Sequence, residues 1–150
     1  MIQIFITGGT FDKSYNYKNG ELFFEKTHLP EMLKRSRCRL KISVETLMMI
    51  DSLEMNSSHI NNIISKCQEC LSNKIVITHG TDRMVSTAKA LTKAKINNKT
   101  IMNSSSGKTS FYFSPKNWRY FKSNQPIYYS SSLLSIHQII INFPRIFNCF

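Results

Sequence analysis

Acidic residues are missing from almost half of the sequence. All nine Asp and Glu residues of the 150-residue chain lie at or before Asp82, so the stretch from Arg83 to Phe150 contains none. The net charge of +11 therefore comes largely from missing acids and not from a dense cluster of Lys and Arg. A basic chain can bind nucleic acid or an anionic membrane. Nucleic acid is not the partner we expect, although a basic nucleic-acid-binding protein stays open as an alternative.

Long apolar runs are also missing. No run reaches the roughly 18 residues that span a bilayer, so no contact with a membrane is expected. The N-terminus lacks the basic start, apolar core and small-residue cleavage site of a signal peptide, which predicts a cytoplasmic location. The four cysteines would then be mostly reduced. With 41% hydrophobic residues, the chain is globular in class and long enough for one domain with its own core.

Strands and helices are predicted to alternate over the first two thirds of the chain. Four apolar or β-branched runs predict strands, at 1–6, 40–50, 74–78 and 99–102. A further short strand or hairpin arm is expected at 21–24. With helices between the strands, this order favours an α/β fold with a Rossmann-like parallel sheet and flanking helices.

Three helices are predicted between these strands, at about 27–37, 56–71 and 81–94. Their expected N-caps are polar residues at the predicted start of each helix: Thr27, then Asn56 to Ser58, then Thr81 or Asp82. The second helix has an apolar face at helical spacing, made of Ile60, Ile63, Ile64, Cys67 and Leu71.

Cys67 and Cys70 form a Cys-x-x-Cys pair inside the second predicted helix. Such a pair can be a redox motif or half of a zinc site. Because no second pair with ligand spacing exists, we interpret both as buried or half-buried structural cysteines.

The composition changes at residue 103. Ser, Asn, Phe, Tyr and Lys dominate 103–150, so we expect a domain over 1–102 and a basic, acid-free tail whose structure is irregular or uncertain. Residues 107–110 end like a phosphate-binding loop, but Met102 stands where that loop needs glycine, and we reject this reading. Composition permits a strand at 136–143 or a helix at 133–141. Aromatic and basic residues at 111–121 can stack on single-stranded nucleic acid, although an ordinary aromatic patch is preferred.

Polar residues follow three of the predicted strands. Gly8-Gly9 let the backbone turn and leave amide N–H groups uncovered, and Thr10 comes next. Asp51-Ser52 follow the second strand, and Thr81-Asp82 follow the third. Because the carboxyl ends of parallel strands share one edge of a sheet, these residues are expected to converge. A hydroxyl beside free amides is a candidate acyl-transfer site, while plain turns and helix caps remain the alternative for each pair.

In combination, these stretches resemble the bacterial L-asparaginases, more closely their short single-domain form. Thr7-Gly8-Gly9-Thr10 is similar to the first signature of the family, and His79-Gly80-Thr81-Asp82 to the second. Asp51-Ser52 resembles the substrate-binding pair between them, and Tyr15 the loop tyrosine of the short form. The resemblance covers residues 1 to about 102.

The resemblance implies hydrolysis of L-asparagine to aspartate and ammonia through a threonine nucleophile, with no metal or other cofactor. Thr10 would attack the amide carbon, and Tyr15, on a mobile loop that closes over the substrate, would help to activate it. Thr81 would position a proton acceptor or water. The residues that would hold the α-amino and α-carboxylate groups are Asp51, Ser52 and Asp82, with Gly9 and Gly80. A homo-oligomer with shared sites is also implied.

The last third of the chain departs from the family. Its members continue with a glycine-containing loop, an Asp-containing segment and a lysine that pairs with the acidic residue of the second signature. Residues 103–107 do not match, and Lys108, Lys116 and Lys122 lie in no recognisable family context. A reading-frame shift would produce such a loss, and a divergent native tail is the other explanation. The sequence therefore supports an asparaginase-type amidohydrolase whose proton relay is impaired, or an inactive remnant of one.

Overall fold

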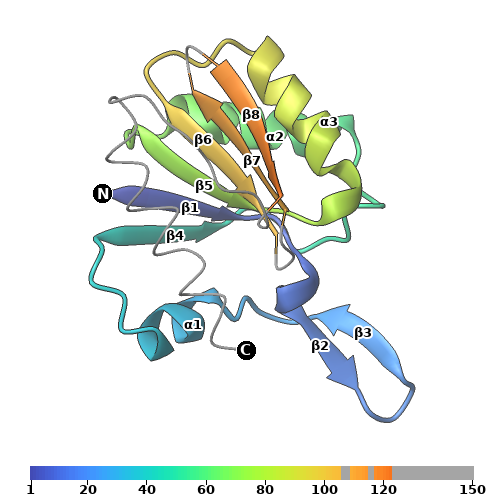
Figure 1. Ribbon diagram of the computed structural model, residues 1–150. Coiled ribbons are helices and arrows are strands. Elements are labelled where there is room, and N and C mark those ends of the chain that lie inside the picture. Colours follow the sequence, from blue (N-terminus) through green and yellow to red (C-terminus); the bar gives the residue numbers. More distant parts are fainter. Residues whose placement is uncertain (106–108, 115–116, 123–150) are drawn as a thin grey trace.

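A six-stranded sheet dominates the computed structural model, which describes residues 1–105, 109–114 and 117–122 (Figure 1). The strand order is β4-β1-β5-β6-β7-β8. Four strands are parallel: β1 (Ile2–Ile6), β4 (Ile42–Thr46), β5 (Lys74–Thr78) and β6 (Thr100–Ser104). The predicted α/β class, with a parallel sheet flanked by helices, is confirmed.

Helices cover both faces of the parallel strands. Helices α2 (Ser57–Glu69) and α3 (Thr81–Lys93) lie on one face, and α1 (Leu29–Arg35) lies on the other (Figure 1). Because successive strand residues point to opposite faces, Phe5 joins the core cluster under α2 and α3, while Ile4 and Ile6 join Leu29 of α1. Burial on both faces explains why these strands read as nearly continuous apolar runs.

Two of the three predicted N-caps are wrong. Helix α1 has His28 at its N-cap, and Thr27 lies one residue earlier, where its Oγ1 accepts a hydrogen bond from Leu29 N at 3.2 Å. Helix α3 has Gly80 as its N-cap, because Gly80 is the last residue with extended backbone; Thr81 and Asp82 are already helical. Asn56 is confirmed as the cap of α2, since its side chain accepts from the N–H groups of residues 58 and 59.

The second strand is shorter than predicted from 40–50. It ends at Thr46 because the chain then turns back toward β1, where Leu47 N and Met48 N both donate to Ile6 O, at 2.9 and 3.3 Å. The four residues that follow, 47–50, bring the chain to the Asp51-Ser52 pair over the end of β1.

Helix α2 is also shorter than predicted. It ends at Glu69, so that Cys67 lies inside the helix but Cys70 is its C-cap, and Leu71 is fully exposed instead of lying on the apolar face. The predicted burial is confirmed, since Cys67 is buried and Cys70 is half-buried. Burial raises the pKa of Cys67 to about 12, which makes it a poor nucleophile and metal ligand at neutral pH.

The sheet continues beyond the four parallel strands. Strands β7 (Thr109–Ser114) and β8 (Asn117–Lys122) add to β6 in antiparallel pairs, an arrangement that the sequence did not predict. The alternatives considered for 133–143 lie outside the described residues, as do Lys108 and Lys116; Lys122 is the last residue of β8.

A separate two-stranded hairpin projects from the carboxyl edge of the sheet (Figure 1). It consists of β2 (Lys13–Asn16) and β3 (Glu21–Phe24), which confirms the strand predicted at 21–24, and a 3-10 turn, η1 (Thr10–Asp12), joins it to β1. Within the described ranges, none of the helices has both the length and the apolar character needed to cross a membrane.

Candidate active site

The carboxyl ends of β1 and β5 are bonded to each other. Thr7 Oγ1 donates to Thr78 O at 2.6 Å, and Thr7 N donates to Thr78 Oγ1 at 3.4 Å. Thr10 follows Thr7 by three residues and Thr81 follows Thr78 by three, a stretch of chain that spans at most roughly 11 Å. Both candidate threonines therefore leave the sheet at the same edge, as predicted, and both are exposed there.

The loop after β4 packs directly against two glycines of this edge. A Cβ on Gly8, whose φ is +94°, would lie 2.5 Å from Ile50 O, and a Cβ on Gly80 would lie 2.4 Å from Ser52 Oγ. Both approaches are closer than real Cβ atoms show, so a larger residue requires a shift of the Ile50 backbone at Gly8 and of the Ser52 side chain at Gly80. Gly9 is buried, has an extended backbone and is the N-cap of η1, directly before Thr10.

Ser52 and Asp82 are brought together from separate elements. Buried Ser52 donates its hydroxyl proton to Asp82 Oδ2 at 2.8 Å. Asp82 is exposed and lies in the first turn of α3, where the helix dipole favours a negative charge. No side chain caps α3, so the N–H groups of its first turn can meet a ligand oxygen at this edge.

Asp51 has a cationic partner that sequence reasoning missed. Lys13 Nζ, from the start of β2, donates to Asp51 Oδ2, and Leu53 N donates to Asp51 Oδ1 at 3.0 Å. The bond from Lys13 is the main reason why the pKa of Asp51 lies below its usual value. A single lysine in a loop has no feature in the sequence that separates it from a solvated surface residue.

Tyr15 lies on strand β2 of the hairpin. The register pairs Tyr15 with Leu22 and Lys13 with Phe24, so Tyr15 and Lys13 share one face of the hairpin. Lys13 directs that face to Asp51. The Tyr15 ring is 51% exposed and packs edge-on against Tyr17, with ring centroids 5.1 Å apart. In the described part of the chain, Thr10 and Tyr15 form no hydrogen bond with each other.

Two further buried residues hold the signature segments in place. The His79 ring is buried between the end of β5 and α3, where Nδ1 donates to Gly80 O at 2.6 Å. Because a carbonyl can only accept, the proton is on Nδ1, and Thr87 Oγ1 then donates to Nε2 at 2.9 Å. Burial lowers the pKa of His79 and keeps the ring neutral. Asp12 Oδ1 accepts from His28 N at 3.1 Å, which ties η1 to α1, and burial raises its pKa.

The edge thus offers an exposed hydroxyl at Thr10, one carboxylate from the loop after β4 and one from the first turn of α3, and the start of that helix. This set suits a small ligand that carries both an ammonium and a carboxylate group. Among the side chains that the structure describes, no group of three or more His, Cys, Asp or Glu comes together in a way that could hold a metal ion.

Comparison with known families agrees with this arrangement. The family model for the N-terminal domain of asparaginase matches residues 1–109. The chain belongs to the asparaginase family. The match runs past the predicted end of the resemblance at about 102 and takes in the whole of β6.

Solved structures of asparaginases share this fold. The thermostable L-asparaginase from Thermococcus kodakarensis is 25% identical, with a TM-score of 0.50 over 60% of this chain and 28% of that one. L-asparaginase I from Vibrio cholerae is 22% identical, with the same TM-score and the same two coverages. The chain therefore spans 28% of the length of either structure. A search of curated proteins finds no match.

Proposed function

We propose that this chain is an asparaginase-type amidohydrolase that converts L-asparagine to aspartate and ammonia, with Thr10 as its nucleophile. The observation that carries the proposal is that three segments meet at one sheet edge: the turn after β1 with Thr10, the loop after β4 with Asp51-Ser52, and the start of α3 with Thr81-Asp82. Membership of the family supports it, as does the likeness to a solved protein that is named as an L-asparaginase.

The proposed reaction is acyl transfer in two steps. Thr10 Oγ attacks the side-chain amide carbon, and its proton passes to the leaving nitrogen, so that ammonia departs and an ester to Thr10 forms. Water, positioned by Thr81, then attacks the ester and releases aspartate. Backbone N–H groups near η1 and at the start of α3 are suited to stabilise the oxyanion in each step.

The other residues of this sheet edge bind the α-ammonium and α-carboxylate groups of the substrate in this proposal. Asp51 and Asp82 have the charge that an α-ammonium requires. The Ser52 hydroxyl and the backbone at Gly9 and Gly80 suit the α-carboxylate. Substrate and residues would meet at the exposed rim of the sheet, where Thr10 is also exposed.

In this proposal the hairpin has to move before the Tyr15 hydroxyl can contact Thr10. The hairpin is a two-stranded sheet of its own, and two-stranded ribbons have little independent stability. Closure of the hairpin over the bound substrate would bring the Tyr15 hydroxyl to Thr10, where it would help to activate the nucleophile and exclude water.

Ammonia release from L-asparagine by the full chain tests the proposal. We expect release that is lost in Thr10→Ala and partly retained in Thr10→Ser, which keeps a hydroxyl. Thr92→Ala is the matched control, because Thr92 lies near the other end of α3 and its hydroxyl bonds only to Ala88 O in the described chain. Unchanged release in Thr10→Ala would refute the nucleophile. No release from a folded chain at millimolar asparagine would favour the inactive remnant.

The assembly and location of the protein are parts of the same proposal. Membership of the asparaginase family supports a homo-oligomer with shared sites and a cytoplasmic location. Sedimentation of the purified chain at several concentrations tests the first, and a monomer at all of them would contradict it.

A further inference from the structure

Lys13 connects the hairpin to the loop that carries the proposed substrate-binding pair. Its ammonium donates to Asp51 Oδ2 and lies 5.5 Å from the centroid of the Phe24 ring on the neighbouring strand β3. The side chains of Lys13 and Asp51 are 22% and 29% exposed, so the pair is partly shielded from water. The other oxygen of Asp51 accepts from Leu53 N.

The two carboxylates of the site are therefore not equivalent. Asp82 accepts from the neutral Ser52 hydroxyl, and no cation pairs with it in the described part of the chain. Asp51 has its charge balanced by Lys13. An ammonium group that approaches Asp51 has to share or take the position that the Lys13 ammonium occupies.

We propose that Lys13 is a specificity-determining residue, whose ammonium competes with the α-ammonium of an amino-acid ligand for Asp51. This inference rests on the proposed function, since it assumes that the amino-acid part of the ligand lies at Asp51. The site therefore prefers a ligand with an α-ammonium over a ligand of the same shape that lacks it, and Lys13 makes this preference smaller.

The size of the effect follows from the exposure of the pair. A partly exposed ion pair is worth up to about 1 kcal/mol, so removal of the competitor can raise affinity by up to about fivefold. This increase in affinity is limited to ligands that have the ammonium group, because a ligand without it makes no ion pair with Asp51.

The test compares L-aspartate with succinate, which is aspartate without its α-ammonium. Calorimetry on the full chain gives a Kd for each ligand and their ratio. In Lys13→Met we expect L-aspartate to bind about two- to fivefold more tightly relative to succinate than in the unmodified protein. Lys13→Arg should keep the original ratio, because it keeps the ion pair.

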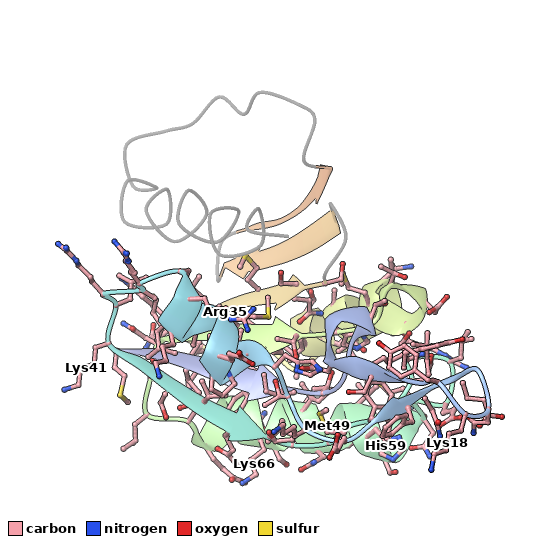
Figure 2. All side chains as sticks on the ribbon, turned by 90° about the horizontal axis from the view of Figure 1, so that it is seen from below. Lys18, Arg35, Lys41, Met49, His59 and Lys66 are labelled. Atoms are coloured by element: carbon pink, nitrogen blue, oxygen red, sulfur yellow. The ribbon has the colours of Figure 1, made fainter. Side chains whose placement is uncertain are left out.

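Lys18→Met is the matched control on the same hairpin. Lys18 is exposed in the turn between β2 and β3, and Figure 2 shows it at one end of the molecule, with Lys41 at the opposite end. Its removal changes the net charge as Lys13→Met does but leaves Asp51 paired. In an Asp51→Asn background, Lys13→Met should have no further effect on the ratio.

The possible results separate this inference from the proposed function. A ratio that does not rise in Lys13→Met, in a chain that releases ammonia from asparagine, overturns the inference alone. A rise in the ratio without any ammonia release supports the inference and contradicts the hydrolase. If neither ligand binds at millimolar concentration and no ammonia appears, both fail.

Discussion

The Ser52 hydroxyl donates a hydrogen bond to Asp82 Oδ2 at a distance of 2.8 Å, although Asp82 lies thirty positions later in the sequence. The bond joins the loop after β4 to the first turn of α3 and holds the Asp82 carboxylate at the sheet edge. Ser52 is buried and Asp82 is exposed, so the buried residue orients the exposed one. If Asp82 binds the α-ammonium of the substrate, Ser52 fixes the position of that ammonium indirectly, because it orients the Asp82 carboxylate.

Replacement of Ser52 by Ala should weaken substrate binding and leave the chemical step nearly intact. Loss of one hydrogen bond of about 1 kcal/mol predicts a KM for asparagine about fivefold higher, with little change in kcat. Steady-state ammonia release measures both constants. Ser86→Ala is the control, because Ser86 is an exposed serine of α3, the helix of Asp82, and its hydroxyl bonds only to Arg83 O in the described chain. A fall in kcat with an unchanged KM would contradict this role.

The two glycines that face the loop after β4 should respond differently to alanine. Gly8→Ala meets the Ile50 backbone and has to adopt a φ of +94°, so we expect a loss of about 2 to 4 kcal/mol in the free energy of unfolding. Gly80→Ala has an ordinary backbone conformation and meets the Ser52 side chain, which can move. We expect a loss of about 1 kcal/mol, together with a raised KM, because the Ser52–Asp82 bond is displaced.

Urea denaturation and ammonia release, measured on both glycine variants, test this contrast. Each variant controls for the other, since both add one methyl group beside the same loop. Equal losses of stability would show that the loop moves equally easily at both positions. The close approach to the Ile50 backbone would then not make Gly8→Ala more destabilising than Gly80→Ala.

Apolar runs were enough to predict the four parallel strands and their order along the chain, because β1, β5 and β6 are almost entirely buried. Asn56 was recognisable as a cap because its amide acts on neighbours two and three residues away. Features that depend on distant contacts could not be predicted. Gly80, the N-cap of α3, lies against Ser52, which is 28 residues earlier in the sequence, and Lys13 is paired because the hairpin brings it to Asp51. The site's location was thus predictable, and its partnerships were not.

The buried imidazole of His79 should make stability fall at mildly acidic pH. Its pKa in the folded chain lies below the ordinary value of 6.5, so below pH 6.5 the unfolded state binds the proton more readily than the folded state. Stability is complete above pH 6.5 and decreases as the pH falls toward the folded pKa, with a slope of up to about 1.4 kcal/mol per pH unit.

His79→Gln provides the control for this pH dependence, because an amide can bond to Gly80 O and Thr87 without titrating. Urea midpoints measured between neutral and mildly acidic pH should decrease for the unmodified chain and stay nearly constant for the variant over the same range. Parallel decreases in both proteins would assign the effect to another group.

Asn103 should be a source of instability in the sheet. It lies on β6, on the same strand face as Ile101 of the core under α2 and α3, and is 2% exposed. Its Nδ2 and Oδ1 atoms have no hydrogen-bond partner among the described residues. Because an unsatisfied buried polar group costs about 1 to 3 kcal/mol, Asn103→Leu, which keeps the number and branching of the side-chain heavy atoms, should increase the free energy of unfolding by about that amount.

Asn56 is the matched control for Asn103, since the oxygen of its side-chain amide is hydrogen-bonded. Asn56 Oδ1 accepts from Ser58 N at 3.0 Å and from His59 N at 3.2 Å, so Asn56→Ala should lower the free energy of unfolding by about 1 kcal/mol. The two asparagine replacements are therefore expected to have opposite signs in the same urea titration. A destabilised Asn103→Leu chain would mean that the amide has a partner or a solvated position, and the apolar environment assigned to this face of β6 would be wrong.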